Sequence, residues 1–294
     1  MGAFLYVDDL ALLAPTRSAL AAMLAVVEDY SKSHNLRFSV DPNPKLSKTK
    51  CIFFGGHRRN GPPAPLLLYG KLLPWVETAQ HLGHHLHQSL SMDHDTKLRR
   101  AIFISRSVEV REQFSFAPPA QVLKAVQVFC CDAYGSPLWC LESKSATSFF
   151  KAWSSCVRRV YRLPVDTFTY LVEGHLAKGF TPLRNQVLGR FPGFFRRLGD
   201  SPSREVRMMA ALAADWAQSV TARNLNHLRN LTGLDPASDS IRHLKTALPV
   251  KEVPENEQWR LGLLDGLLAL RAETQGDSES SKRTVAMLSS LCST

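Results

Sequence analysis

The sequence predicts an α+β fold, and three observations support this class. Across the first ninety residues, short apolar runs that suit β-strands alternate with one amphipathic helix. From about residue 93 onward, apolar positions recur at spacings of three and four, which is the helical period. The chain has 294 residues, 45% of them hydrophobic and 21% charged, so it can bury a core. We therefore expect an antiparallel sheet region followed by an all-helical region.

The N-terminal segment predicts a β-hairpin. Apolar runs at 3–7 and 10–13 flank two adjacent acidic residues, Asp8 and Asp9. Two neighbouring carboxylates at the tip of an apolar hairpin cost free energy unless something compensates their charge, and a divalent metal ion is the usual compensation. Asp8 and Asp9 are therefore the first candidate metal ligands.

A helix and several short strands are expected next. Thr16 or Ser18 can cap the helix, which should run to about His34 and end at Asn35. Alternating apolar residues, Gly turns and Pro-rich loops then predict strands separated by loops. The expected strands are 36–40, 50–54, a hairpin of 66–69 and 72–75 around Gly70-Lys71, and a short strand through His81-Leu82-Gly83, with a basic, Pro-rich loop at 57–65.

The rest of the chain predicts helices. Pro118-Pro119 can start one of them, and Gly135 and Pro137 can stop it. Regular apolar spacing marks the others. The expected helices are Lys97 to Arg111, Pro118 to about Ala133, 145–162, one continuous stripe from Val206 to Val220, and Trp259 to Leu270, and the polar tail after Gln275 is expected to fray.

The charge balance favours a polyanionic partner. Lys and Arg together number 36 against 26 Asp and Glu, which gives a net charge of +10. The calculated pI is ≈ 9.5. Such a balance is typical of proteins that bind nucleic acid, and plain solubility is the alternative explanation.

The six cysteines indicate free thiols. They form no C-x-x-C motif, so a zinc ribbon is not expected. Cys130 and Cys131 lie in an apolar stretch and are predicted to be buried. Free thiols suit a reducing intracellular compartment, the cytoplasm or the nucleus. The sequence begins with no secretory signal and contains no apolar run of about 18 residues, so we expect no membrane partner.

An ordered set of motifs follows the chain from its start. The set is Tyr6-Val7-Asp8-Asp9, the helix at 18–34, the segment from Asn35-Leu36 to Ser47-Lys48-Thr49-Lys50-Cys51, the turn at Tyr69-Gly70 and the strand His81-Leu82-Gly83. In this order it resembles the palm of a reverse transcriptase of the non-LTR (LINE-type) retrotransposons. That family has an aromatic-x-Asp-Asp hairpin, a lysine-containing segment and a strand called the primer grip.

The helical region resembles the thumb and the region after it in the same family. The matching pieces are Ala133 to Trp139, Val157 to Pro164, Phe191 to Phe195 and Ser201 to Val206. The resemblance covers about residues 1–235. It implies a partial palm at 1–90, a helical thumb at 91–165, a helical C-terminal region at 166–275 and a disordered tail at 276–294.

The resemblance implies roles for five residues in RNA-directed DNA synthesis with two Mg²⁺ ions. Asp8 matches the essential metal-binding carboxylate and Asp9 a supporting one. Tyr6 matches the position that packs near the primer terminus. Lys48 or Lys50 matches a general acid toward the leaving pyrophosphate, and a solvated lysine on a strand edge is the alternative for either. No small-molecule cofactor is implied.

The resemblance also leads us to expect an incomplete site. In the family, the other essential carboxylate belongs to a strand that precedes the hairpin, whereas this sequence begins at Met1. Downstream, Asp41 lies in a loop, and Asp93 and Asp95 suit the start of a helix. We therefore expect that the isolated chain does not polymerise. The unpaired edge of the partial palm sheet is expected to favour self-association.

Candidate nucleic-acid contacts fall into two sets. The resemblance places His81, Leu82 and Gly83 at the primer grip. The expected basic helix adds cations that suit template-primer phosphates: Lys97, Arg99, Arg100, Arg106 and Arg111. The second set is Arg158, Arg159, Arg162, Arg190, Arg196 and Arg197, interleaved with Tyr161, Phe191, Phe194 and Phe195. Arginine with aromatics suits stacked single-stranded RNA, and an amphipathic helix with a buried aromatic face is the alternative.

A histidine cluster is interpreted as structural. His81, His84, His85 and His87 crowd one short stretch. They alternate across the expected strand, so they cannot all converge on one metal ion. A polar strand face is the expected arrangement.

Two functions of different classes follow. The first is a piece of a retrotransposon reverse transcriptase that is inactive alone, from a 5′-truncated element or from a gene model that begins at an internal Met. The second is a non-catalytic nucleic-acid-binding or structural remnant of such an element, whose RNA binding would not change with Asp8→Ala. A scaffold unrelated to polymerases is disfavoured by the order of the motifs.

Overall fold

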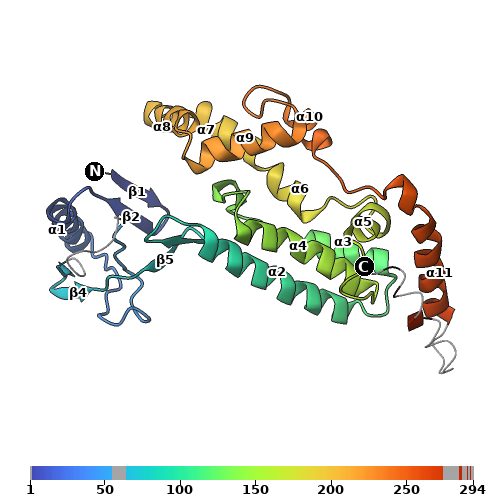
Figure 1. Ribbon diagram of the computed structural model, residues 1–294. Helices are drawn as coiled ribbons and strands as arrows, with labels where there is room; N and C mark the ends of the chain where they lie inside the picture. Colours follow the sequence, from blue (N-terminus) through green and yellow to red (C-terminus); the bar gives the residue numbers. More distant parts are fainter. Residues whose placement is uncertain (1, 55–63, 274–284, 287–289, 291, 293–294) are drawn as a thin grey trace. The chain divides into compact units, whose positions relative to one another are not determined.

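The computed structural model describes residues 2–54, 64–273, 285–286, 290 and 292. The chain divides into two compact units, Met1–Asp95 and Thr96–Thr294. The first unit holds small antiparallel sheets and one helix, and the second is helical (Figure 1). The predicted α+β class is confirmed at this level, and the change from strands to helices falls close to the expected position.

Three separate antiparallel hairpins make up the sheets of the first unit (Figure 1). Each sheet has two strands, and among the described residues none pairs with a neighbouring hairpin. The hairpins are β1 (Gly2–Tyr6) with β2 (Asp9–Leu13), β3 (Leu66–Leu68) with β4 (Lys71–Leu73), and β5 (Thr78–His81) with β6 (His84–His87).

The helix of this unit, α1 (Arg17–Ser33), forms where it is predicted. The Thr16 hydroxyl accepts a hydrogen bond from the Ala19 amide at 3.2 Å, so Thr16 rather than Ser18 is the N-cap. Its inner face contributes Leu24 to a small core. The buried members of that core are Leu24, Cys51, Leu66, Leu68 and Leu73.

Two predicted strands, 36–40 and 50–54, are wrong as regular strands. Phe38 and Val40 still pack against the core, so the alternation of buried and exposed residues is present. Their backbone groups, however, make single hydrogen bonds instead of a regular ladder. The Phe38 amide donates to the Tyr69 hydroxyl at 3.4 Å, and Cys51 makes only an isolated bridge with Trp75.

Two turns differ from the prediction by a residue or more. The β3–β4 turn is Tyr69-Gly70, not Gly70-Lys71, and both residues have positive φ (53° and 70°). Glu28 stabilises it by accepting the Tyr69 amide at 2.8 Å. The expected strand through His81-Leu82-Gly83 is a second correction, because Leu82 and Gly83 (φ 48° and 77°) form the tip of the β5–β6 hairpin. Paired positive φ values are typical of tight hairpin turns. The basic loop predicted at 57–65 lies mostly outside the described residues.

The helices of the second unit follow one another with short connections (Figure 1). The first of them, α2, begins at the end of the first unit. They are α2 (Asp93–Gln113), α3 (Pro119–Phe129), η1 (Ser136–Leu138), α4 (Lys144–Val160), α5 (Thr169–Leu171), η2 (Val172–Leu176), α6 (Leu183–Leu188), α7 (Phe191–Gly199), α8 (Arg204–Asp215), α9 (Val220–Thr232), α10 (Ile241–Ala247), η3 (Glu255–Glu257) and α11 (Trp259–Glu273).

An aromatic cluster joins α2, η1 and α4. The Phe149 ring meets Phe103 edge-on at 6.2 Å and Trp139 at 5.1 Å, and all three side chains are buried. Trp153, one turn further along α4, is also buried. Aromatic pairs in this geometry add to the stabilisation from burial. The helix at 145–162 is thus confirmed as α4, whose N-cap is Ser143.

Two helix predictions are corrected in extent. The helix from Pro118 ends at Phe129, because Cys130 caps it before the predicted end at Ala133. The stripe from Val206 to Val220 is not one helix: α8 ends at Asp215 and α9 starts at Val220. Trp216, at the break, is 64% exposed, so a regular three-and-four spacing here does not mark one buried face.

The last helix packs through Leu264 and Leu267, which are fully buried with Leu163 and Leu171. The predicted helix from Trp259 is therefore confirmed, although Trp259 itself is 55% exposed. The prediction of a frayed tail after Gln275 falls largely outside the described residues. In the described part of the chain, no helix combines the length and apolar character that crossing a bilayer requires.

All six cysteines are free thiols. Cys130 and Cys131 are buried, as predicted. Burial raises the pKa of Cys131 to about 12 and that of Cys156 to about 11, from an ordinary value of 9.0. Both thiols are therefore protonated in the folded protein at neutral pH.

These raised thiol pKa values predict a loss of stability in alkali. Below about pH 8 both states keep the thiols protonated, whereas from about pH 8 toward 12 the unfolded state releases the Cys131 proton more readily than the folded state. Between pH 8 and 10 we expect Cys131 to account for a fall of about 1.4 kcal/mol in the free energy of unfolding. Urea unfolding with reductant, compared between the wild type and Cys131→Ala, measures it. An equally steep pH dependence in both proteins would refute the assignment.

Candidate functional site

The β1–β2 hairpin presents the two acidic residues at its tip. The register pairs Tyr6 with Asp9, which leaves Val7 and Asp8 as the two-residue turn. Only β2 has a partly buried run, Leu10 to Leu12, whereas β1 is exposed along most of its length. Val7 has a φ of 56°, a strained value for a β-branched residue. Strain of this kind is concentrated at functional sites.

The tip is open to solvent. Asp8 and Asp9 are both exposed, and neither has a hydrogen-bond or ion-pair partner among the described residues. Their neighbours Tyr6 and Val7 are 64% and 83% exposed. Two adjacent carboxylates without a cation partner repel each other, and a divalent cation would relieve that repulsion.

The donor set at the tip fits part of a magnesium site. Mg²⁺ commonly takes one or two carboxylates and completes its shell with water and substrate phosphates. Asp8 and Asp9 supply two such carboxylates on one turn. Across the described residues, no group of three or more His, Cys, Asp or Glu side chains gathers in a way that could hold a metal ion. The hairpin therefore offers two oxygen-bearing ligands and leaves the others to a substrate or another segment.

Lys48 and Lys50, the candidate general acids, lie on an irregular segment of the first unit. The Thr49 amide donates to the Ser39 carbonyl at 3.2 Å, and the Cys51 amide to the Pro74 carbonyl at 3.0 Å. These bonds anchor the backbone on both sides of Lys50 and directly after Lys48, while both side chains are exposed. Among the described residues, neither lysine forms an ion pair with Asp8 or Asp9, so the choice between the two lysines stays open.

His81 is the last residue of β5, and Leu82 and Gly83 form the tip of the β5–β6 hairpin rather than continuing a strand. The same hairpin is tied to the start of α2, because the His85 amide donates to the buried Asp95 carboxylate at 3.4 Å. The histidines of β6 thus belong to a hairpin that docks on the helix start.

The basic residues of α2 divide between two sides of the helix. At about 100° per residue, Lys97, Arg100 and Arg111 share one side, and Arg99 and Arg106 share another. Arg99 is partly buried, 3.7 Å from Asp132 and stacked over Tyr134. Arg100 donates to the Ser148 carbonyl. Lys97 and Arg106 are exposed and have no partner among the described residues, so they are the better candidates for phosphate contacts.

The second basic set is largely structural. Arg158 donates twice to the Thr167 carbonyl, at 2.9 and 2.6 Å, and holds the loop after α4. Arg196 donates to the Asp239 and Pro236 carbonyls. Phe191 is buried and stacks on Phe195. The alternative of an amphipathic helix with a buried aromatic face describes this region better than an array of stacking platforms.

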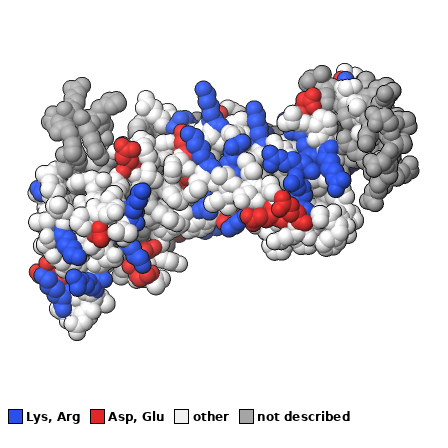
Figure 2. All heavy atoms as spheres, turned by 90° about the horizontal axis from the view of Figure 1, so that it is seen from below, with Lys and Arg blue, Asp and Glu red and all other residues white. Residues whose placement is uncertain are grey.

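Lys and Arg side chains nevertheless gather on one face of the helical unit. Figure 2 shows this face, on which a cluster of acidic side chains borders the basic ones. A surface of this kind raises the local concentration of anions.

The helical unit also has two pockets that the sequence did not predict. One has a volume of about 630 Å³ and the other about 570 Å³, and Pro182 and Asn185 line both. Their walls come from segments more than fifty residues apart, such as Gln186 and Lys245. No short motif links these segments, so only the fold reveals the pockets.

Comparison with known proteins found no match to any protein-family model, to any curated protein or to any solved structure.

Proposed function

We propose that this chain is part of a reverse transcriptase of the non-LTR retrotransposon type, and that it does not extend a primer by itself. In this proposal Asp8 and Asp9 hold divalent metal ions at the tip of the β1–β2 hairpin, and Tyr6 lies beside the primer terminus. Bound Mg²⁺ supplies charge stabilisation to the phosphoryl group during nucleotidyl transfer. The chain's own contribution is to place the two carboxylates next to each other at the tip of a short hairpin.

The observation that carries the proposal is the geometry of this tip. Asp8 stands in the two-residue turn and Asp9 in the last strand pair, both exposed and without a cation partner among the described residues. The order of elements adds support, since this hairpin is followed by α1, a lysine-bearing segment, two further hairpins and a basic helix.

The proposed inactivity of the chain alone rests on the ligand count. Two-metal nucleotidyl transfer needs oxygen ligands from at least two strands. In the part of the chain that the structure describes, no third His, Cys, Asp or Glu joins Asp8 and Asp9. Metal ions held by two carboxylates alone bind weakly and leave an incoming nucleotide poorly aligned.

A primer-extension assay tests this proposal. The full chain and Asp8→Asn are incubated with a primer-template, Mg²⁺ and deoxynucleotides, and neither is expected to extend the primer. Extension by the wild type that Asp8→Asn abolishes would overturn the proposed inactivity. It would also establish the carboxylate hairpin as a complete active site.

A non-catalytic nucleic-acid-binding role is the second candidate, supported by the basic face in Figure 2 and by the unpartnered Lys97 and Arg106. It predicts RNA binding that weakens steeply with salt and does not change with Asp8→Asn. Replacing both cations by Gln should reduce the slope of log affinity against log salt by about one or more. An unchanged slope would show that α2 does not contact the RNA. Lys144→Gln, which replaces an exposed cation on α4, is the control for the loss of a positive charge elsewhere.

A further inference from the structure

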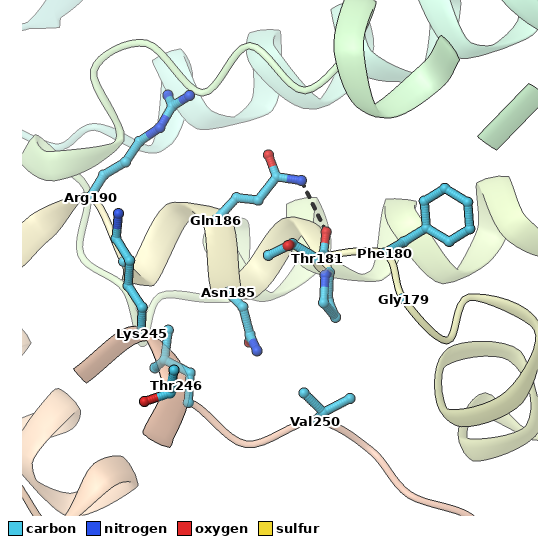
Figure 3. A pocket seen from close by; sticks show the side chains of 12 residues that line it. Gly179, Phe180, Thr181, Asn185, Gln186, Arg190, Lys245, Thr246 and Val250 are labelled. Carbon is cyan, nitrogen blue, oxygen red and sulfur yellow. Dashed lines mark hydrogen bonds between the residues drawn. The ribbon is translucent and has the colours of Figure 1, made fainter. Parts of the chain in front are cut away.

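The pocket of about 630 Å³ in the helical unit has a cationic end and an apolar end (Figure 3). Arg190 follows α6, and Lys245 belongs to α10. Figure 3 shows the Lys245 side chain extending toward Arg190, so both charged groups lie at the same end of the pocket. Phe180 and Val250 lie away from this end. A ligand that suits the pocket therefore has an anionic group and a flatter, less polar body.

No negative charge in the pocket neutralises this pair. The lining contains two basic side chains and no Asp or Glu. Among the described residues, neither Arg190 nor Lys245 has an ion-pair partner. The nearby Cys131 thiol does not take that role, because burial raises its pKa to about 12 and keeps it neutral. Two like charges on one wall without a counter-charge attract an anion, and phosphate oxygens suit the paired donors of Arg and Lys.

Gly189 lies directly beside the aliphatic stem of Lys245. A Cβ atom on Gly189 would lie 3.2 Å from Lys245 Cγ and 3.3 Å from its Cε, so the lysine stem occupies the space that a side chain would fill. Gly189 has a φ of −70°, which any residue can adopt. The absence of a side chain here leaves room for the stem of Lys245, whose side chain is otherwise exposed, and for the Asn185 carbonyl oxygen, which would lie 3.1 Å from the Cβ atom.

We infer that this pocket binds a nucleoside 5′-phosphate group, with the phosphate between Arg190 and Lys245 and the base toward Phe180. A volume of about 630 Å³ is in the range of small-ligand sites. An aromatic side chain accepts any base by stacking. The nucleoside 5′-phosphate group belongs either to a free mononucleotide or to the 5′ end of a nucleic acid. The site lies wholly in the helical unit and does not involve the carboxylate hairpin.

Calorimetric titration of the full chain with AMP, adenosine and a 5′-phosphorylated trinucleotide tests the inference. We expect AMP or the trinucleotide to bind with a dissociation constant of about 1 mM or tighter, and adenosine to bind at least about tenfold more weakly. Stronger binding of AMP identifies the free nucleotide as the source of the phosphate. Binding of the trinucleotide alone identifies a nucleic-acid end.

Three variants locate the site. The double variant Arg190→Gln/Lys245→Gln should weaken phosphate-ligand binding by at least about tenfold. Gly189→Ala should weaken it while leaving both charges present, because a Cβ atom there crowds the lysine stem and the Asn185 carbonyl oxygen. Arg242→Gln, an exposed cation on the same helix as Lys245 and outside the pocket, should change binding less than about twofold. Thermal unfolding confirms that each variant folds. No binding by the wild type, or equal binding by the double variant, would overturn the inference.

Discussion

Replacing Asn224 with Ala should lower the free energy of unfolding of the helical unit by about 2–5 kcal/mol. The Asn224 side chain is fully buried on α9. Its amide donates to the Trp139 carbonyl at 2.8 Å, and its oxygen accepts the Leu141 amide at 3.0 Å. Truncation removes both hydrogen bonds from this buried region, and each lost bond costs about 1–3 kcal/mol.

Urea unfolding monitored by tryptophan fluorescence measures this effect, since Trp139 and Trp153 are buried in the same unit. Asn230→Ala is the matched control, because Asn230 is an exposed asparagine on the same helix. The control should stay within about 0.5 kcal/mol of the wild type. A similar small change in Asn224→Ala would show that α9 does not depend on this pair of bonds.

The second large effect is expected from Gly174→Ala. A Cβ atom at Gly174 would lie 2.5 Å from the Lys251 carbonyl oxygen and 3.3 Å from Glu252 Cα. Because these are backbone atoms, they cannot rotate away as the end of a flexible side chain can. Overpacking of this kind costs about 2–3 kcal/mol, and here it would separate η2 from the segment around Lys251.

Gly266→Ala provides a control with the opposite sign. Gly266 lies inside α11, and a Cβ atom there meets nothing within 4 Å. Alanine in a helix interior is favoured over glycine by about 0.5–1 kcal/mol, so this variant should be more stable than the wild type. Equal unfolding midpoints for Gly174→Ala and the wild type would contradict the described packing of η2.

The sequence predicted the elements whose signals are local. The β1–β2 hairpin needs only its own alternating apolar residues, and the Thr16 cap and the spacing of α1 lie within one helix. The segments 36–40 and 50–54 show where prediction from local patterns fails. Their side chains follow the strand pattern, but a strand also requires a neighbour with free backbone groups, and that depends on tertiary structure.

Between Val206 and Val220, helical spacing likewise did not suffice to predict the extent of the helices. The spacing continues through Trp216, yet α8 ends at Asp215 and the tryptophan is exposed. Periodicity identifies a face of a helix and does not establish that the helix is continuous or that the face is buried.

The candidate site was predictable to different degrees. Asp8 and Asp9 occupy the tip of a paired hairpin, as the motif implies. The basic residues of α2 were correctly placed on a helix, but the engagement of Arg99 with Asp132 and Tyr134 depends on contacts across more than thirty residues. No sequence signal predicts that Arg190 and Lys245 line the same pocket, because they are far apart in the sequence and only the fold places α10 near Arg190.

The most direct test of the proposed metal-bearing hairpin is a titration of the isotope-labelled chain with Mn²⁺, followed by nuclear magnetic resonance. We expect selective broadening of the Val7, Asp8 and Asp9 amide signals. The double variant Asp8→Asn/Asp9→Asn should abolish this broadening. The control Asp29→Asn, on the exposed side of α1, should leave it unchanged. Absence of selective broadening at the hairpin, or equal broadening in the double variant, would contradict the proposed metal-bearing hairpin.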